Sequence, residues 1–136
     1  MRKLQYPVVD LFAGPGGLGE GFATLKRRKK SGFCAAVSIE QDKFAHQTLQ
    51  LRHFLRAFPD GAAPEEYYGY ISGQVEREEL EKRYPKEWQS VLNSTFKISL
   101  GEENHEKVKN IISERLGKRD KWVLVGGPPC QAYSIV

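Results

Sequence analysis

The apolar run Tyr6–Phe12 passes directly into the glycine-rich turn Ala13-Gly-Pro-Gly-Gly17. Such a nearly continuous run is typical of a strand that is buried on both faces, as in a parallel sheet. The glycines predict a tight turn, and the residues from Leu18 to about Lys29 predict a helix that Gly19 and Gly21 weaken. A strand buried in this way needs helices on both faces of its sheet, which favours a layered α/β fold.

The rest of the chain repeats this alternation. Further strands are predicted at Phe33–Ile39, Thr95–Leu100 and Trp122–Val125, with helices at Asp42–Phe58, Val75–Leu92 and Asn104–Leu116. An order of strand, helix, strand throughout predicts a parallel sheet with right-handed crossovers, the first half of a doubly wound fold. Ligands bind such a fold at the carboxyl ends of its strands.

The helix predicted at Asp42–Phe58 has Asp42 placed to cap its start. One apolar face is predicted for it, at spacings of four and three residues: Phe44, Thr48, Leu51, Leu55 and Phe58. Residues 59–73 carry glycines and prolines and are interpreted as a loop. Pro85 must break or restart the following helix, and Gly117 suits the end of the last one.

Length, charge and cysteine content limit the class of protein and the compartment that can be expected. The 136 residues amount to about one domain, with a formal net charge of +4. The basic run Lys26–Lys30 is interpreted as a solvated helix end, with a phosphate-facing role left open. Cys34 and Cys130 form no disulfide framework, and no stretch has the roughly 20 apolar residues of a membrane helix. A reducing cytoplasmic compartment with no membrane contact is therefore expected.

The glycine turn and one acidic residue together predict a ligand. Gly14, Gly16 and Gly19 match the pattern G-x-G-x-x-G between a strand and a helix. Glu40 ends the second predicted strand, where a carboxylate accepts hydrogen bonds from the two hydroxyls of a ribose. The pattern favours an adenosine-containing cofactor and leaves a dinucleotide and S-adenosylmethionine equally open.

Cys130 follows the fourth predicted strand, after Pro128 and Pro129, whose fixed backbone stiffens the approach. A cysteine attacks as the thiolate, so a nucleophilic role needs a lowered pKa. No histidine is close in sequence. The three histidines lie on predicted helices and are interpreted as surface residues: His46, His53 and His105. Local chemistry supports a nucleophile and a structural cysteine equally.

Two segments resemble the signature motifs of the DNA (cytosine-5) methyltransferases. Asp10-Leu-Phe-Ala-Gly-Pro-Gly-Gly17 is similar to their S-adenosylmethionine loop, and Gly126-Gly-Pro-Pro-Cys-Gln-Ala-Tyr-Ser134 is similar to their catalytic loop. Both occur in the family's order. The resemblance implies a Rossmann-like methyltransferase fold, S-adenosyl-L-methionine as cofactor, double-stranded DNA as substrate, no metal, and a setting such as a restriction-modification system.

The resemblance also implies roles for individual residues. Cys130 would add to C6 of cytosine, C5 would take the methyl group, and loss of the C5 proton would expel the thiolate. The base must leave the helix stack for this chemistry. Cofactor contacts are implied for Asp10, Leu11, Phe12, Ala13, Gly14, Gly16, Gly17, Glu40, Gln41 and Pro129, and substrate contacts for Pro129, Gln131 and Ser134.

The sequence departs from the family pattern in three places. Gln41 is polar where the family often has an aromatic or other apolar residue against adenine. An acidic residue expected after the third strand has one candidate, Glu102, for which a solvated helix start is the favoured interpretation. The family's later Glu-Asn-Val segment, arginine pair, target-recognition domain and C-terminal segment have no counterpart here.

We therefore expect residues 1–136 to be the N-terminal part of a catalytic domain. Its activity would need the missing C-terminal part or a complementing subunit, and the isolated chain is expected not to methylate DNA. Three alternatives stay open at this stage. They are the same chemistry on RNA, a non-catalytic module that binds S-adenosylmethionine or a partner subunit, and a nicotinamide-dependent oxidoreductase.

Overall fold

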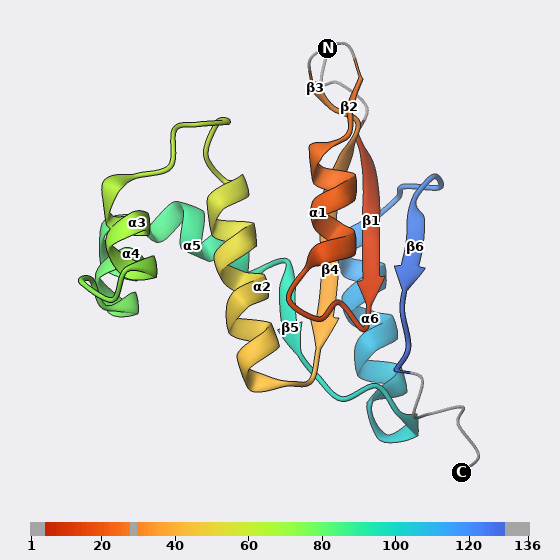
Figure 1. The fold of residues 1–136 in the computed structure, drawn as a ribbon. Helices are drawn as coiled ribbons and strands as arrows, with labels where there is room; N and C mark the ends of the chain where they lie inside the picture. The colour runs from red at the N-terminus through yellow and green to blue at the C-terminus, as the bar shows by residue number, and fades with distance from the viewer. Residues whose placement is uncertain (1–4, 28–29, 130–136) are drawn as a thin grey trace.

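The computed structural model of the chain describes residues 5–27 and 30–129. Its main sheet contains β1 (Tyr6–Leu11), β4 (Phe33–Glu40), β5 (Thr95–Lys97) and β6 (Val123–Gly126). The strands lie in the order β5-β4-β1-β6 and every pair is parallel (Figure 1). This arrangement confirms the predicted α/β fold and is consistent with an incomplete Rossmann-like methyltransferase fold.

The strand register brings the carboxyl ends of the strands to one edge. Leu11 pairs with Ile39 of β4 and with Gly126 of β6, while Glu40 pairs with Lys97 of β5. A Cβ at Gly126 would lie 2.6 Å from the carbonyl oxygen of Leu11, so only glycine fits this close approach. Four loops therefore emerge together at this edge.

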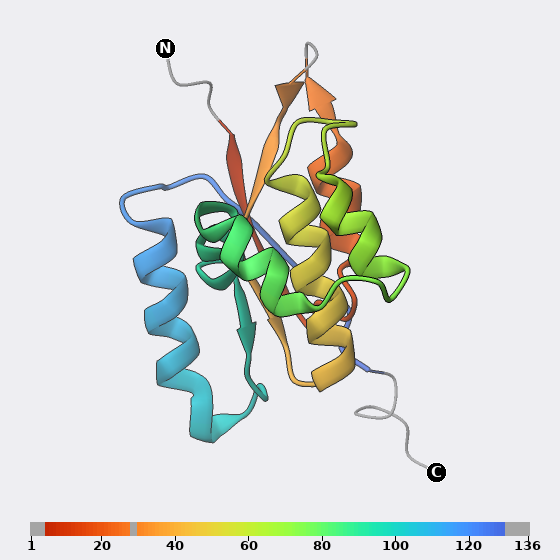
Figure 2. The same ribbon diagram turned by 90° about the vertical axis from the view of Figure 1, so that its left-hand side faces the viewer.

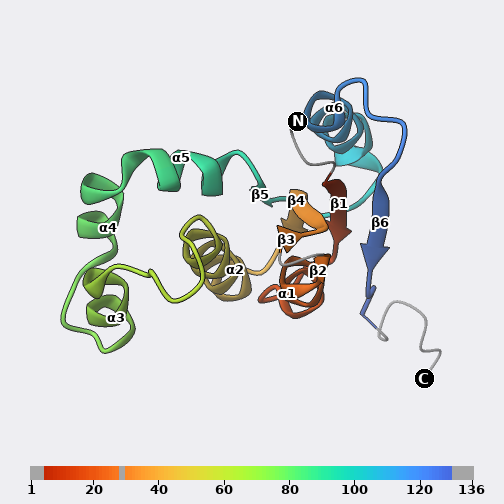
Figure 3. The ribbon, with the colours of Figure 1, turned by 90° about the horizontal axis from the view of Figure 1, so that it is seen from above.

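Helices cover both faces of the sheet (Figure 3). On one face lies α6 (His105–Leu116), preceded by the 3₁₀ turn η1 (Glu102–Asn104). Its Val108 and Leu116 join Val9, Val37 and Ile39 of the sheet in the main apolar core. Gly117 ends α6 with a φ of 58°, as predicted for a helix terminator.

The other face carries α1 (Gly17–Thr24) and α2 (Lys43–Arg56). Asp42 caps α2 by accepting a hydrogen bond from the Ala45 N–H at 2.8 Å, which confirms the predicted cap. The predicted apolar face of α2 is confirmed only in part, because its Leu51 and Phe58 pack in the core whereas its first residues do not. Phe44 is 73% exposed, whereas the fully buried positions of the helix are Leu49, Gln50 and Phe54.

The cause of this difference is a second core that the chain builds beside the sheet. It is formed by α3 (Glu65–Ile71), α4 (Arg77–Arg83) and α5 (Pro85–Leu92), which extend away from the sheet in Figure 3. Phe54 of α2 lies at its centre, with Leu80, Trp88 and Val91. Thus α2 faces two cores, and its buried side is set by both.

Two local predictions in this region have different outcomes. Pro85 begins α5, where its missing N–H leaves no hydrogen bond unmade, so the predicted helix break is confirmed. The prediction of a loop over residues 59–73 is wrong in its second half, because α3 begins at Glu65. The aromatic side chains Tyr67 and Tyr70 of α3 pack against the second core, and this tertiary packing stabilises a short helix that has little local signal.

The basic run also differs from prediction. Helix α1 ends at Thr24, and β2 (Lys26–Arg27) pairs antiparallel with β3 (Lys30–Ser31) in a hairpin (Figure 2). The run is therefore not a helix end. The hydroxyl of Thr24 donates to the carbonyls of Glu20 and Gly21, and the Leu25 N–H donates to Phe22, which closes the last turn of a helix already weakened by glycine.

In the part of the chain that the structure describes, no helix combines the length and apolar character needed to cross a membrane. Strand β6 is an outer strand of the sheet, and its Leu124 is 58% exposed.

Candidate functional site

The loop between β1 and α1 is held by backbone hydrogen bonds. The Ala13 N–H donates to Ile39 at 2.8 Å, and the Gly16 N–H donates to Ala13 at 3.0 Å. Phe12 has a φ of 60°, which is rare for an aromatic residue, and its side chain is 41% exposed. Strained backbone of this kind is concentrated at functional sites. The loop thus presents an exposed aromatic ring at the carboxyl end of β1.

Glu40 is fixed against this loop. One carboxylate oxygen accepts a hydrogen bond from the Gly14 N–H at 2.8 Å, and the other accepts from the Asp42 N–H at 2.7 Å. The acid and the glycine turn, 26 residues apart in sequence, are thereby brought together. Each carboxylate oxygen keeps a lone pair for a further donor.

The glycines of the loop differ in their surroundings. A Cβ at Gly16 would lie 3.0 Å from Leu49 and 3.2 Å from Arg52, so Gly16, at a φ of 94°, lets α2 pack against the loop. Gly14 and Gly17 have no heavy atom within 4 Å of a Cβ position. The space beside the Cα atoms of these two glycines is therefore open, next to the start of α1.

These groups fit S-adenosylmethionine by their chemistry. The N–H groups of Gly17 and Leu18 at the start of α1 suit a carboxylate, the Glu40 carboxylate suits two vicinal hydroxyls, and the exposed Phe12 ring suits a purine. A cavity of about 740 Å³ adjoins Phe12 and runs past Leu100 along α6 to Trp122, with a mainly apolar lining. The space is sufficient for an adenosine group.

Asp10 lies beneath the loop. The residue is 2% exposed, and neither carboxylate oxygen has a hydrogen-bond partner among the described residues. Burial raises the pKa of Asp10 to about 6, and the facing backbone N–H of Gly19 lowers it in part without a well-formed hydrogen bond. The neighbouring Leu11 borders the cavity beside Phe12, and Ala13 is buried.

A polar chain links the next two strand ends. The hydroxyl of Ser99 donates to the Gln41 side-chain oxygen at 3.0 Å, and the Asn104 side-chain amide donates to the Ser99 carbonyl at 2.9 Å. Glu102 is exposed at the start of η1, the position of a solvated helix start. Sequence reasoning did not identify Ser99 as a site residue, since a lone serine after a strand has no distinguishing signal.

The remaining expected site residues lie after β6. Pro129 is exposed and follows the strand at the same edge of the sheet as the glycine loop. Cys130, Gln131 and Ser134 lie outside the described residues, so their expected roles stay predictions.

The interpretation of the histidines as surface residues is wrong for His53. Its Nδ1 lies 2.8 Å from the Ser94 hydroxyl, its Nε2 lies 3.4 Å from the Ser38 hydroxyl, and burial lowers its pKa to about 4. His46 is half-buried, whereas His105 is exposed as expected. His53 is half-buried, since it lies one helical turn after the buried Leu49 and Gln50 on the same side of α2.

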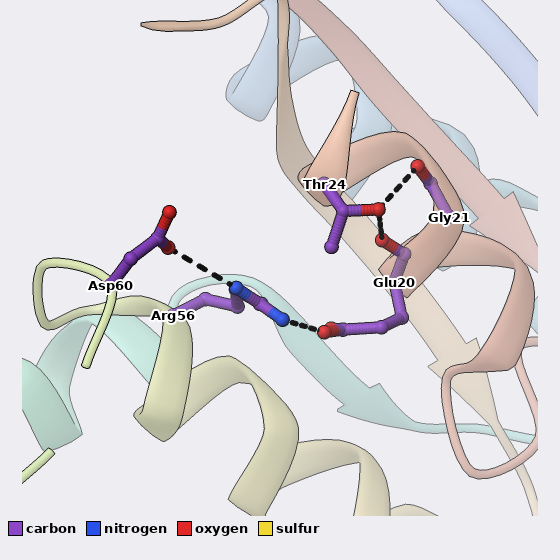
Figure 4. Close-up of polar contacts among 5 residues, drawn as sticks. All are labelled: Glu20, Gly21, Thr24, Arg56 and Asp60. Atoms are coloured by element: carbon purple, nitrogen blue, oxygen red, sulfur yellow. Dashed lines mark hydrogen bonds and ion pairs between the residues drawn. The ribbon is translucent and has the colours of Figure 1, made fainter. Parts of the chain in front are cut away.

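A second cavity, of about 440 Å³, lies between α1 and α2 near His53. Arg56 of α2 spans the two helices by pairing with Glu20 of α1, and it also lies 3.5 Å from Asp60 (Figure 4). This charged group ties α1, which follows the glycine loop, to α2.

Comparison with known proteins adds one relationship. No family model matches the chain, and no solved structure matches it. Over 146 aligned residues the chain is 33% identical to a protein of Bacillus paralicheniformis named Type II methyltransferase M.Bpa9945I. The match covers 95% of this chain and 32% of that protein, so the chain spans about a third of the relative's length. The chain is thus similar to part of a methyltransferase.

Proposed function

We propose that this chain is the cofactor-binding part of a DNA methyltransferase that acts on C5 of cytosine. The observation that carries the proposal is the hydrogen bond from the Gly14 N–H to the Glu40 carboxylate at 2.8 Å. It joins the glycine turn and the acidic residue in the arrangement that suits a nucleoside at the edge of a parallel sheet. The similarity to a protein named as a Type II methyltransferase supports transfer of a methyl group.

In this proposal the described residues hold S-adenosyl-L-methionine. Phe12 packs against the adenine, Glu40 accepts from the ribose hydroxyls, and the N–H groups at Gly17 and the following residues of α1 bind the carboxylate. When bound, the cofactor supplies an electrophilic methyl group. The other implied contacts in this loop act through its shape, and they are Asp10, Leu11, Ala13 and Gly16.

Cys130 is the proposed nucleophile. Its thiolate adds to C6 of a cytosine that has been turned out of the double helix, which places electron density on C5. After C5 has taken the methyl group, loss of the C5 proton expels the thiolate and restores the ring. Pro129, Gln131 and Ser134 are the proposed contacts to the base.

The proposal includes a complementing part. Strand β6 is an outer strand with an exposed Leu124, and an uncovered edge of this kind pairs readily with another strand. The match covers 32% of the relative, and we propose that a counterpart of part of its remaining length covers this edge. We expect the complete assembly to work in the cytoplasm, on double-stranded DNA, and residues 1–136 alone to transfer no methyl group.

A graft tests the proposed reaction. Residues 1–136 would replace the matching third of the Bacillus paralicheniformis protein, and methylated nucleosides would be identified by mass spectrometry after digestion of the DNA. We expect 5-methylcytosine, and a loss of at least about a thousandfold in Cys130→Ser, because the covalent route is closed. Cys34→Ser is the matched control and should keep the activity.

Two results would overturn the proposal. One is a product methylated on an exocyclic nitrogen, since that chemistry needs no addition to C6. The other is full activity in Cys130→Ser. Methylation of DNA by the ungrafted chain would contradict the need for a complementing part.

A further inference from the structure

The cavity between α1 and α2 is separate from the cavity beside Phe12, because no described residue lines both. Its volume of about 440 Å³ is typical of small-molecule sites. Strand β5 pairs with β4 only from Ser38 to Glu40, so the first half of β4 has no neighbouring strand on that side among the described residues. The cavity reaches this open stretch of β4, where Cys34 and Ala35 belong to its lining.

The charged side chains in the lining of this cavity are three arginines and two acids. Arg52 and Arg56 come from α2, and Arg115 comes from α6. The acids are Glu20 and Asp60, and Arg56 lies between them and pairs with both (Figure 4). Because one arginine engages both acids, the charges of the other two arginines are left without an acidic partner in this lining.

Arg52 is the arginine with the fewest polar contacts. Its side chain is half-buried, and it forms no hydrogen bond or ion pair with any residue that the structure describes. Its Cδ lies 3.2 Å from the position of a Cβ at Gly16, so the side chain runs beside the glycine loop. A guanidinium has five N–H donors, keeps its charge at any physiological pH, and pairs with oxygen anions through two parallel hydrogen bonds. Its position therefore suits an oxygen anion in the cavity.

His53, which also lines the cavity, adds no positive charge. The Ser94 hydroxyl donates to the Ser90 carbonyl at 3.0 Å, so its oxygen accepts from the Nδ1–H of His53 at 2.8 Å. The Nε2 atom then carries the lone pair and lies 3.4 Å from the Ser38 hydroxyl. Burial lowers the pKa of His53 to about 4, so the ring is neutral at physiological pH. The arginines alone therefore supply the positive charge of the lining.

We propose that the cavity between α1 and α2 binds a small molecule through an oxygen anion, a phosphate or a carboxylate group, with Arg52 as its main ligand. Arg115 borders the same cavity and its Nε lies 3.5 Å from the Ala36 carbonyl, which leaves its other N–H donors for the bound molecule. The inference goes beyond the proposed function, because the site lies apart from the proposed ribose and adenine contacts and needs no cofactor.

Nuclear magnetic resonance titration of the ¹⁵N-labelled chain with sodium phosphate and with sodium acetate, at constant pH and ionic strength, tests the inference. We expect at least one of the two anions to shift the backbone amide signals of Gly16, Gly19 and Glu20 and the Nε–H signal of Arg52. The dissociation constant should be in the millimolar range or below. The anion that binds more tightly identifies the group that the site prefers.

Two variants test the role of Arg52. Arg52→Gln should weaken binding by about tenfold or more, because a charge-assisted pair is lost. Arg52→Lys keeps the charge without the two parallel donors and should lose less affinity. Lys86→Gln, which removes one positive charge at an exposed position of α5, is the matched control and should leave the affinity unchanged.

A third variant should change the affinity in the opposite direction. Glu20→Gln removes the carboxylate that pairs with Arg56, so this guanidinium becomes available to the added anion. We expect binding to become tighter by about threefold or more. Glu78→Gln, which removes one negative charge at an exposed position of α4, is the matched control and should have no effect. A change that only loosened the fold would weaken binding.

Two results would overturn the inference. One is the absence of shifts around the cavity with both anions. The other is an affinity that is the same in Arg52→Gln as in the wild-type chain, which would indicate a general attraction of anions to a positively charged protein. Neither result bears on the proposed cofactor site, because that site is tested with S-adenosyl-L-homocysteine.

Discussion

Replacing Asp10 with asparagine is expected to remove a loss of stability that the wild-type protein shows between about pH 4 and pH 6. Burial raises the pKa of this carboxyl from 3.8 to about 6 in the folded state. In that interval the folded protein keeps a proton that the unfolded chain has released. Linkage then requires the free energy of unfolding to fall as the pH rises, and to level off above the folded pKa.

The size of the effect follows from the two pKa values. The interval from 3.8 to about 6, at about 1.4 kcal/mol per pH unit, corresponds to roughly 3 kcal/mol. Asparagine does not titrate. The difference in unfolding free energy between Asp10→Asn and wild type should therefore rise by about this amount from pH 4 to pH 8, in favour of the variant.

Urea unfolding followed by circular dichroism at five pH values between 4 and 8 measures this difference. Taking the difference between variant and wild type cancels the titration of the other groups. Asp120→Asn, at an exposed position, is the matched control and should show no dependence on pH. A constant difference between Asp10→Asn and wild type over the whole range would refute the reasoning.

Two further predictions concern the second core and Glu40, the proposed ribose ligand. Phe54→Ala should lower the free energy of unfolding by about 3–5 kcal/mol, because the ring is 0% exposed and packs on Tyr84. Phe44→Ala, at a 73% exposed position of the same helix, should cost less than about 0.5 kcal/mol in the same urea assay, and equal losses would contradict the fold. Glu40→Gln should weaken binding of S-adenosyl-L-homocysteine by at least roughly tenfold, whereas Glu65→Gln, at an exposed position of α3, should not, as calorimetry would show.

The parallel sheet, and the edge at which the cofactor is proposed to bind, could be predicted because the sequence patterns that indicate them are local. The apolar run before the glycine turn indicates a buried strand, and the turn itself allows few conformations. Glu40 ends the next strand, and parallel strands bring their carboxyl ends together. The parallel sheet and the common edge of Glu40 and the glycine turn follow from these rules, whereas the strand order β5-β4-β1-β6 and the hydrogen bond between Gly14 and Glu40 are seen only in the structure.

The side of α2 that is buried could not be predicted from the helix itself. The pattern 44-48-51-55-58 competes with a second face that contains Leu49, Gln50, His53 and Phe54. The second face is buried because α3, α4 and α5 fold back on it. That packing depends on contacts from residues 65–92, and the same side of α2 carries the half-buried His53, whose ring nitrogens face Ser38 and Ser94.

The basic run Lys26–Lys30 is the other segment in which the observed structure differs from the local helix signal. Positive charge near a helix end is a common pattern, and it predicts a longer α1. The glycines of α1 lower its helix propensity, and the chain instead turns at Leu25 into the β2–β3 hairpin. The hairpin lies beyond the amino ends of the strands, away from the glycine loop (Figure 1).

Nuclear magnetic resonance on the ¹⁵N-labelled chain is the most direct test of the cofactor site. Titration with S-adenosyl-L-homocysteine should shift the amide signals of Phe12, Gly14, Gly17 and Glu40, and leave those of residues 65–92 unchanged. The Gly14 signal should move most clearly, because its N–H donates to the Glu40 carboxylate that would take the ribose. Absence of shifts at saturating ligand, or shifts confined to the cavity between α1 and α2, would contradict the account.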